Sequence, residues 1–530
     1  MIFVNVFVFV LVLGVIILVH EFGHYYFAKK AGILCHEFAI GMGPVAYQKR
    51  KGETVYSIRM IPIGGFVSMA GESINDALIK KEDRIGVELN PSGQIVEIVL
   101  TDKKKASITG TVQSFDLYGK DQSPLFIELD IEGTMTRYPV SREAVYTLSE
   151  TKQMWITPQE KSFESKTLSQ RFMVIFAGPL MNFILALLLF FIVGWFVTKP
   201  NLDQNEIGSV ASNSPADSIG IKSGDRLVNI NGNPITTWSD IGLTMSSITK
   251  ASVSVQIERN GQTFEHEIIP VILIQSAGIS NFKPEDTKNN TPAIRYADLP
   301  IIGRAFGRAS TNGGLKTGDR IVSLSLGDNH KDIHHWDDIL LFFNTVELKG
   351  VVTVTYLREG NVLTTSYDII SQEALEKLGA SAIVNQIGIS PTSSFDFLYS
   401  LSYPWDAFKD SMGQVLATIG LLFNRNENLG IGDLSGPVGI FNLVSATRSQ
   451  GLLAVIGFTA FLSINIGLLN LLPIPALDGG RLVFLGIEAI TRKPINRKLE
   501  NIINNVMLFV LLGLFVYVTY NDIFRLIRGS

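Results

Sequence analysis

Two histidines and a glutamate stand close together near the end of the first apolar stretch of the chain. The run His20-Glu21-Phe22-Gly23-His24 has the pattern H-E-x-x-H. On a helix, positions i and i+4 lie on one face, so both imidazoles can reach the same Zn²⁺ ion. The glutamate between them can act as the general base that activates a water molecule. The pattern therefore predicts a zinc hydrolase with His20 and His24 as ligands and Glu21 as the base.

Composition indicates a membrane protein that carries such a site. Hydrophobic residues make up 46% of the 530 residues, and only 18% are charged, below the roughly 25% of a typical soluble protein. The net charge of −4 argues against a general nucleic-acid binder, which would normally be basic. The single cysteine excludes an intrachain disulfide and a cysteine-rich zinc ribbon.

Four stretches are long enough to cross a bilayer, which needs about 20 apolar residues. They are Met1–Ala28, Phe172–Thr198, Gly451–Leu477 and Asn501–Asn521. The first lacks the basic start and small-residue cleavage site of a signal peptide, so we expect it to be retained. An alternative interpretation of the histidines is that this span ends at Val19 and that His20 and Glu21 enter the membrane interface.

Basic residues near the span ends predict the topology, because cytoplasmic loops are enriched in lysine and arginine. They gather between spans 1 and 2 and between spans 3 and 4, as in Lys49-Arg50-Lys51 and Arg492-Lys493. We therefore expect both of these connections in the cytoplasm. The long connection between spans 2 and 3 and both termini should lie outside.

A zinc hydrolase needs a third protein ligand. His266, His330, His334 and His335 fall in the predicted external region, on the wrong side of the membrane. Asp478 ends the uncharged third stretch on the cytoplasmic side, where His20 and His24 also end the first. Pro473 and Pro475 should break the helix there and allow the carboxylate to turn inward. The alternative is a solvated aspartate at a helix C-terminus, before the glycines of a common turn.

The regions between the spans suggest additional modules. Ile61–Met69 is apolar but too short to span, which favours a membrane-associated β-hairpin. Residues 82–158 contain β-rich runs and predict a small cytoplasmic β domain. The run Gly220–Val228 recurs as Gly314–Val322, each followed by a helical run from Trp238 or Trp336 and then a strand. A repeat offset by 94 residues predicts two tandem domains, and its motif resembles bacterial PDZ domains.

The combination of motifs resembles the site-2 protease family of intramembrane metalloproteases. The resemblance rests on H-E-x-x-H together with the run from Asn470 to Gly479, which has the pattern N-x-x-P-x-P-x-L-D-G. Further agreement comes from Ile61–Glu72, Gly178–Asn182, Ser435–Ile440 and Ser463–Gly467. The resemblance covers all four spans and the repeat, whereas residues 82–158 depart from the shorter members of the family.

This resemblance implies a fold class, a domain division and a site. The fold is a multi-pass α-helical membrane protein with four transmembrane helices, a membrane-associated β element and two tandem external PDZ domains. The expected divisions are 1–81 (first span and β element), 82–158 (insert), 159–200 (second span), 201–275 and 276–392 (PDZ domains), 393–450 (external amphipathic segment) and 451–530 (third and fourth spans). One zinc per chain would be bound by His20, His24 and Asp478, with Glu21 catalytic. Tentative substrate-binding residues are Asn470, Asn465, Gly64, Gly65 and Phe66.

The implied activity is cleavage of the transmembrane segments of single-span proteins after a first external cut, as in the cleavage of anti-sigma factors during envelope stress. Peptide C-termini are possible partners of the PDZ domains, and membrane lipid is a third partner. One alternative is clearance of remnant signal peptides by the same chemistry. Another is a non-catalytic PDZ scaffold, which would have no need of His20, Glu21, His24 and Asp478.

Overall fold

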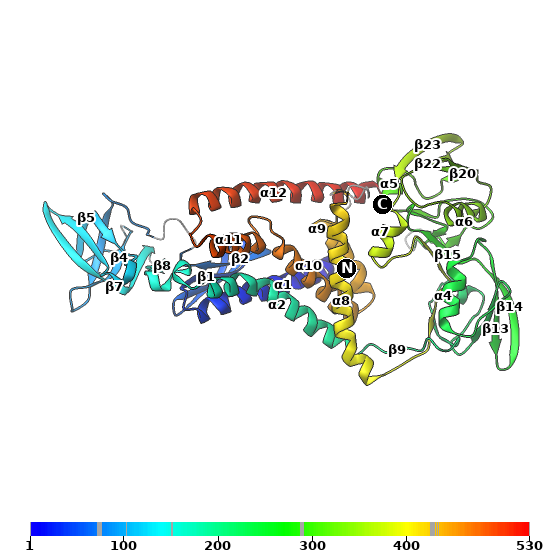
Figure 1. Ribbon diagram of the computed structural model, residues 1–530, viewed down its shortest axis with the longest axis horizontal. Helices are drawn as coiled ribbons and strands as arrows, with labels where there is room; N and C mark the ends of the chain where they lie inside the picture. The colour runs from blue at the N-terminus through cyan, green and yellow to red at the C-terminus, as the bar shows by residue number, and fades with distance from the viewer. Residues whose placement is uncertain are drawn as a thin grey trace. The chain divides into compact units, whose positions relative to one another are not determined.

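The chain folds into two compact units (Figure 1). One unit comprises residues 1–189 and 441–514, and the other comprises residues 190–440 and 515–530. The computed structural model describes residues 2–71, 77–101, 103–149, 152–286, 291–424, 430, 432 and 434–528.

Within these described ranges, four helices are long and apolar enough to cross a membrane. They are α1 (Ile2–Lys30), α2 (Leu168–Gly194), α10 (Leu452–Leu471) and α12 (Arg497–Arg528). The four predicted membrane stretches are therefore confirmed as long apolar helices. Two shorter helices flank α10, namely α9 (Pro437–Ser449) and α11 (Asp478–Thr491).

The third apolar stretch is shorter as a helix than its composition predicts. Helix α10 ends at Leu471, and the residues up to Leu477 form an irregular connection. Two prolines in that connection cannot continue the backbone hydrogen bonds of a helix. The alternative interpretation of Asp478 as the end of a helix was wrong, because Asp478 is the first residue of α11.

A long β-hairpin follows α1. Its strands are β1 (Cys35–Lys51) and β2 (Thr54–Met69), and both contact α1. Residues 37–40 of β1 pair with residues 65–68 of β2 and also with residues 55–58. The hairpin therefore folds back on itself, with residues 65–69 along one edge. Gly64 adopts a φ of +81°, a left-handed conformation that glycine tolerates best, at the start of this edge segment.

The predicted β-rich insert is a compact domain. Its strands are β3 (Arg84–Leu89), β4 (Ile95–Val99), β5 (Ile108–Asp116), β6 (Phe126–Ile131), β7 (Thr134–Ser149) and β8 (Lys152–Trp155). They form one sheet in the order β4-β3-β5-β6-β7-β8, and an additional pairing of β4 with β7 closes five strands into a ring. Its core contains fully buried side chains such as Ile85, Ile98 and Leu129. Single 3₁₀ turns occur at Lys120–Gln122, Gln159–Lys161 and Phe163–Ser165.

The second unit contains the predicted repeat as two similar modules. The first module has β10 (Ile207–Val210), α3 (Pro215–Ser218), β11 (Arg226–Ile230), β12 (Asn233–Pro234), α4 (Trp238–Ser246), β13 (Val253–Arg259) and β14 (Gln262–Ile268). The second has α5 (Arg308–Thr311), β20 (Arg320–Leu326), β21 (Asn329–Asp332), α6 (Trp336–Thr345), β22 (Val351–Arg358) and β23 (Asn361–Asp368). The orders β12-β11-β13-β14 and β21-β20-β22-β23 are equivalent.

The repeated glycine-aspartate motif has the same structural role in both modules. Arg259 donates two hydrogen bonds to the buried Asp225, and Arg358 donates two to the buried Asp319. Each pair connects the motif loop to the end of a strand, β13 in the first module and β22 in the second. Burial raises the pKa of Asp225, but the hydrogen bonds from Arg259 outweigh burial and leave this pKa below its usual range.

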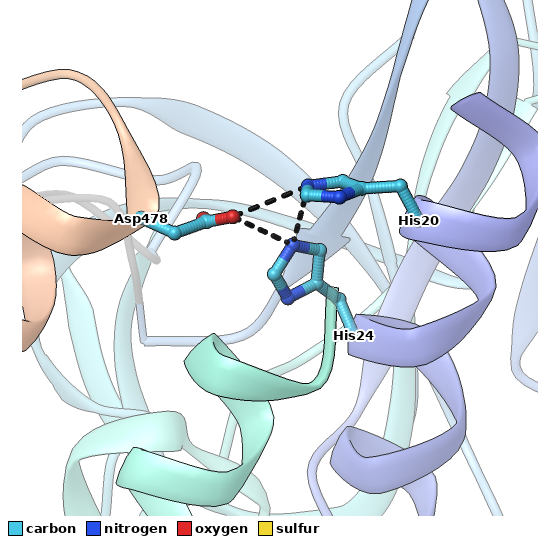
Figure 2. Close-up of side chains that lie close together, drawn as sticks. All are labelled: His20, His24 and Asp478. Carbon is cyan, nitrogen blue, oxygen red and sulfur yellow. Dashed lines mark hydrogen bonds and ion pairs between the residues drawn. The ribbon is translucent and has the colours of Figure 1, made fainter. Parts of the chain in front are cut away.

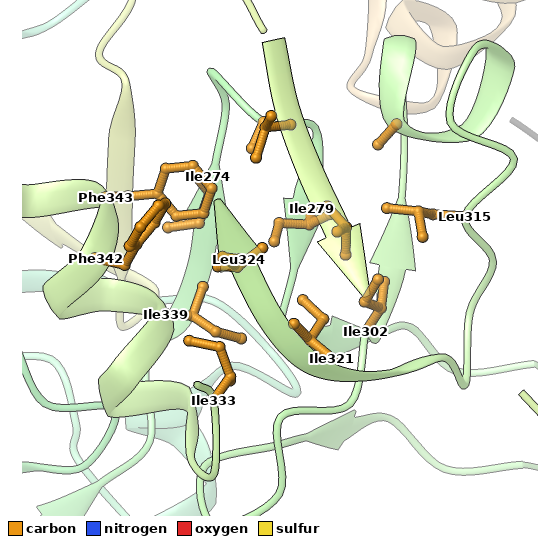
Figure 3. Close-up of a cluster of buried hydrophobic side chains, with 14 of the residues drawn as sticks. Ile274, Ile279, Ile302, Leu315, Ile321, Leu324, Ile333, Ile339, Phe342 and Phe343 are labelled. Atoms are coloured by element: carbon orange, nitrogen blue, oxygen red, sulfur yellow. The ribbon is translucent and has the colours of Figure 1, made fainter. Parts of the chain in front are cut away.

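The boundary between the modules differs from the predicted one at residue 275. Strand β15 (Val271–Ile274) buries Ile272 and Ile274 in the core of the second module, although the expected division placed it in the first. Figure 3 shows Ile274 in this core. Conversely, β25 (Ile389–Pro391) pairs with β10, and Ile387 is buried in the core of the first module. The first module is therefore completed by residues that follow the second along the chain.

Short strands complete the second module and its surroundings. They are β9 (Lys199–Pro200), β16 (Ile279–Ser280), β17 (Phe282–Lys283), β18 (Ile294–Arg295), β19 (Arg304–Ala305), β24 (Ile383–Gln386) and β26 (Ser393–Ser394), together with helix α7 (Gln372–Lys377). Strands β15, β16, β19 and β24 form a sheet in the order β19-β16-β15-β24. The predicted external amphipathic segment contains α8 (Phe397–Leu422), which exposes Leu398, Leu401 and Trp405 at helical spacing.

Candidate metal centre

The two histidines of the H-E-x-x-H pattern lie on one face of α1, as their spacing predicts. His20 and His24 are both buried, with 8% of each residue exposed. Their Nε2 atoms are 3.2 Å apart (Figure 2), which is close enough for both to bind the same ion.

The start of α11 brings Asp478 to these histidines. Asp478 Oδ2 lies 3.2 Å from Nε2 of His20 and 3.4 Å from Nε2 of His24 (Figure 2). The turn before the aspartate is tight, and a Cβ atom at Gly479 would collide with the backbone carbonyls of Leu471 and Leu472. The glycine therefore permits the approach of the helix start to the preceding connection.

These three atoms fit a tetrahedral zinc ion. With zinc–nitrogen and zinc–oxygen bonds of about 2.0–2.1 Å, tetrahedral donor atoms lie about 3.3 Å apart. Asp478 Oδ2 is buried, and its polar neighbours among the described residues are these two imidazole nitrogens, which fits an oxygen that binds a metal ion. In the described part of the chain, His20, His24 and Asp478 form the one group of three or more histidine, cysteine and acidic ligands that could hold an ion.

Helix α2 orients the ring of His24. The backbone carbonyl of Val174 lies 2.8 Å from Nδ1 of His24. The carbonyl oxygen can only accept a hydrogen bond, so Nδ1 must carry the proton. The lone pair of Nε2 is then directed at the metal position, the usual arrangement for a histidine ligand.

Helix α2 also orients the ring of His20. The buried amide of Asn182 lies 3.2 Å from Nδ1 of His20. The oxygen and nitrogen of an amide exchange places when it turns by 180°. With Oδ1 turned toward His20, the amide accepts from Nδ1–H, and Oδ1 gains the partner that it otherwise lacks. This orientation leaves Nε2 of His20 free to bind the metal ion.

Small residues allow these helices to approach one another. A Cβ atom at Gly178 on α2 would collide with both histidine rings, and one at Gly23 on α1 would collide with the carbonyl of Ala177. The hydroxyl of Ser463 on α10 donates to the carbonyl of Asn182 at 2.8 Å. Close contacts of small residues and interhelical hydrogen bonds are typical of membrane helix bundles.

A cavity of about 580 Å³ opens beside the three ligand residues. Its wall includes Glu21, the backbone segment from Gly64 to Val67, Asn470, and three asparagines of α12. The expected substrate-binding residues Gly64, Gly65, Phe66 and Asn470 are thus in the cavity wall. Asn465 is not, and its amide donates to the carbonyl of Phe461 in its own helix at 3.2 Å.

The edge segment of the hairpin passes close to Glu21. A Cβ atom at Gly65 would lie 3.0 Å from Cγ of Glu21, so glycine leaves room for the carboxylate there. The ring of Phe66 is covered by the guanidinium of Arg59, 4.9 Å from the ring centre. Arg59 also donates to Glu37 at 2.6 Å and to the carbonyl of Gly43 at 2.7 Å. These bonds hold the guanidinium that covers Phe66 against β1.

Ion pairs attach the hairpin to the end of α1 and to the 3₁₀ turn at Gln159–Lys161. Glu53, in the turn between β1 and β2, accepts from Lys29 at 3.1 Å and from Lys161 at 2.6 Å. Burial raises the pKa of Glu53, but the hydrogen bonds from Lys161 and Lys29 outweigh burial and leave the pKa below its ordinary value. Glu53 is therefore ionised at neutral pH and can stabilise the hairpin against the end of α1.

Comparison with known proteins identifies the family. A family model described as Peptidase family M50 matches residues 8–514. The chain belongs to this peptidase family. The resemblance to site-2 proteases is therefore confirmed, and the protein is a membrane metalloendopeptidase of that type.

Curated relatives match almost the whole chain. The zinc metalloprotease RasP of Shouchella clausii is 30% identical over 522 residues, which cover 98% of each chain. The zinc metalloprotease RasP of Oceanobacillus iheyensis is 28% identical over 523 residues, again with 98% of each chain covered. The regulator of sigma-W protease RasP of Bacillus subtilis is 29% identical over 527 residues, 99% of each chain. The first two of these names describe zinc enzymes.

The residues around the ligands were not predicted as part of the site. Asn182, Gly178 and the Val174 carbonyl all come from α2, far from the H-E-x-x-H pattern in the sequence. The one sequence signal was the run Gly178–Asn182, which resembles the family's span 2 motif but has no ligand spacing. The signal that could have indicated a role for this helix is a polar asparagine within a long apolar, uncharged stretch.

Proposed function

We propose that this M50 peptidase cleaves transmembrane segments of single-span membrane proteins, with His20, His24 and Asp478 holding one zinc ion. The observation that supports this most is the convergence of the three ligand atoms in a cavity that also receives Glu21 and the edge of a β-hairpin. When bound, zinc supplies a Lewis acid that polarises a carbonyl and lowers the pKa of water.

Glu21 transfers the proton in this proposal. Its carboxylate takes a proton from the attacking water and returns it to the leaving amide nitrogen of the scissile bond. Val174 and Asn182 keep the two imidazoles in the orientation that leaves Nε2 available. The role of the surrounding helices is to exclude bulk water, which strengthens each of these electrostatic interactions.

The substrate must be extended before it can be cut, because a transmembrane helix hides its amides in its own hydrogen bonds. In the described sheet, residues 65–69 pair with β1 on one side only, and Gly64, Gly65 and Phe66 face the cavity. An unwound substrate segment can add to this edge as a further strand. Asn470 lies in the same wall and can donate to a carbonyl of the bound segment.

The two repeated modules of the second unit are proposed to be PDZ domains on the outer side of a bacterial inner membrane. The repeated motif and the equivalent strand orders support the domain type, and the basic connections between spans 1–2 and 3–4 support the orientation. Strand β25 pairs with β10 but not with a further described strand, so its other edge can accept a peptide C-terminus or restrict the size of substrates.

The biological role proposed is the second cut in regulated intramembrane proteolysis, such as cleavage of an anti-sigma factor after an external first cut. Support comes from the relative that carries the name regulator of sigma-W protease. Remnant signal peptides are the other substrate class that the same chemistry could serve.

The test is cleavage of a single-span substrate, truncated on its outer side, in proteoliposomes that contain zinc-loaded protein. Glu21→Gln should keep bound zinc but slow cleavage by roughly 10²–10⁴-fold, because the general base is lost. Asp478→Asn should lose both zinc and cleavage, whereas Asn465→Ala should resemble wild type. Equal cleavage by wild type, Glu21→Gln and Asp478→Asn would contradict the proposal and favour a scaffold.

A further inference from the structure

An ion pair outside the metal centre joins the helices that carry its parts. Arg171 lies in the first turn of α2, and Glu488 lies in α11. Their side chains form a bidentate pair, with Nη1–Oε2 and Nη2–Oε1 distances of 3.1 and 2.5 Å. The Arg171 side chain is 13% exposed and that of Glu488 is 21% exposed. A planar, two-point pair in a partly buried setting restrains the geometry between two helices more than a single exposed contact does.

Helix α11 buries few of its own residues. Of its fourteen residues, only Gly479, Gly480 and Leu485 are buried. The two glycines belong to the first turn, which carries Asp478. Glu488 lies ten positions further along the chain, roughly 15 Å along the helix axis. The helix is therefore held at its start by close packing and near its end by the ion pair.

Helix α2 is the common support of all three ligand residues. Its Val174 carbonyl accepts from His24, and its Asn182 amide contacts His20. Arg171 precedes Val174 by one helical turn on this same helix. Through Glu488, Arg171 connects α11, and with it Asp478, to the helix that already orients both histidines.

The ion pair between Arg171 and Glu488 borders a small cavity that is lined partly by polar side chains. A cavity of about 130 Å³ beside the pair is lined by both residues and by Arg481, Asn501 and Asn504. Arg481, Asn501 and Asn504 also line the larger cavity at the metal centre. The pair thus lines a cavity that shares these three residues with the cavity at the metal centre.

We propose that Arg171 and Glu488 are positioning residues that set the distance between Asp478 and the two histidines. This inference rests on the proposed metal ligands. Neither residue is among the three ligand residues, so the pair acts on them through α11. Loss of either partner leaves the other charge without its counterpart and frees α11 to move away from α2. Second-layer interactions of this kind change metal affinity by about 10–100-fold when they are removed.

The experiment measures metal binding by full-length protein in detergent. Zinc affinity is obtained by competition with a chelator, and the absorption spectrum of the Co²⁺-substituted protein reports the ligand set. Wild type is compared with Glu488→Gln, Arg171→Gln and the reversed pair Arg171→Glu/Glu488→Arg. The matched control is Arg142→Gln, which removes the ion pair with Glu160, at 2.6 Å, from the inserted domain.

The expected result is a 10–100-fold weaker affinity for zinc and an altered Co²⁺ spectrum in each single variant. The reversed pair should recover most of the affinity, and Arg142→Gln should match wild type. Rescue by the reversed pair distinguishes positioning from a general loss of stability, which would lower the unfolding temperature without moving the spectrum.

Three outcomes would overturn the inference. Single variants with wild-type zinc affinity and Co²⁺ spectrum would show that the position of Asp478 does not depend on the ion pair. A folded reversed pair that binds zinc as weakly as the single variants would show that the charge pairing is not what matters. A reversed pair that fails to fold would assign the two residues a general structural role. Wild type that neither binds zinc nor cleaves would instead contradict the proposed function itself.

Discussion

The side-chain amide of Asn182 lies 3.2 Å from Nδ1 of His20, although the two residues are 162 positions apart in the sequence. The contact joins the second membrane helix to the first at the ring that is proposed to bind zinc. It also accounts for the asparagine in a helix that is otherwise uncharged and apolar over most of its length. In a histidine that binds a metal ion, the hydrogen bond made by one ring nitrogen determines that the other nitrogen is unprotonated and available to the metal.

Asn182→Ala is expected to weaken zinc binding by about 10–100-fold, because His20 loses the partner that fixes its tautomer and ring orientation. Asn182→Asp should bind zinc more tightly than Asn182→Ala, since a carboxylate oxygen can still accept from Nδ1–H. Chelator competition on purified protein measures both affinities. Asn465→Ala is the control, because that amide bonds within its own helix. Unchanged affinity in Asn182→Ala would remove the orienting role.

Gly178→Ala should disrupt the metal centre without adding any polar group. The new Cβ atom would collide with the rings of His20 and His24, so the histidines or the helix must shift. We expect loss of bound zinc and at least a tenfold loss of cleavage. Gly14→Ala on α1 is the matched control, because a Cβ atom there would meet no described atom within 4 Å apart from the adjacent backbone of its own helix. If Gly178→Ala retains zinc and full activity, α2 does not pack on the histidines as described.

Acidification should destabilise the protein through His36, which lies at the start of β1. Burial lowers the pKa of His36 to about 4, and the nearby Glu53 only partly opposes this change. The unfolded chain has the ordinary histidine pKa of about 6.5, so it binds the proton first as the pH falls. Stability is therefore intact above about pH 6.5 and decreases by roughly 3 kcal/mol as the pH approaches 4.

The measurement for His36 is the thermal unfolding midpoint in detergent between pH 7 and pH 4. His36→Gln should show a shallower decline than wild type over this range, because no proton is taken up at this position. His334→Gln, on the exposed surface of the second repeated module, serves as the control variant. Parallel declines in wild type and His36→Gln would assign the acid sensitivity to other groups.

Asp522→Asn is expected to lower stability by about 1 kcal/mol. The buried carboxylate of Asp522 on α12 accepts from the backbone N–H of Gly439 at 2.7 Å, in the first turn of α9. It therefore caps the first turn of a helix that begins at Pro437. Thermal unfolding of Asp522→Asn is compared with that of Asp410→Asn on the exposed face of α8. Equal midpoints for wild type and Asp522→Asn would exclude the capping role.

Much of the architecture followed from local patterns. Long uncharged stretches predicted the four apolar helices, and the repeated glycine-aspartate motif predicted two similar modules. Spacing within one helix was enough to place His20 and His24 on a common face, because a helix has a fixed period. The β-rich runs of the insert likewise predicted strands, although nothing in them indicated that β4 would pair with β7 and close a ring.

Other features of the fold could not be predicted from local sequence patterns. Strand β25 completes the first module after the chain has passed through the second. No motif in residues 389–391 predicts that this strand pairs with β10. The third membrane helix is a different case, because the apolar run predicted too long a helix whereas the two prolines near its end correctly predicted the break. Hydropathy responds to apolar side chains, but Pro473 and Pro475 end the backbone hydrogen bonding before the apolar run ends.

The sequence by itself determined which residues could do the chemistry: two histidines one turn apart, a glutamate between them and a distant aspartate. Only the tertiary structure decided how they meet. Asp478 reaches the histidines from the first turn of a separate helix, and Val174 and Asn182 orient the rings from another. The physical reason is that residue type and helical period determine only the local structure of a segment. The position of one helix against another depends instead on glycine contacts, buried hydrogen bonds and ion pairs between segments hundreds of residues apart.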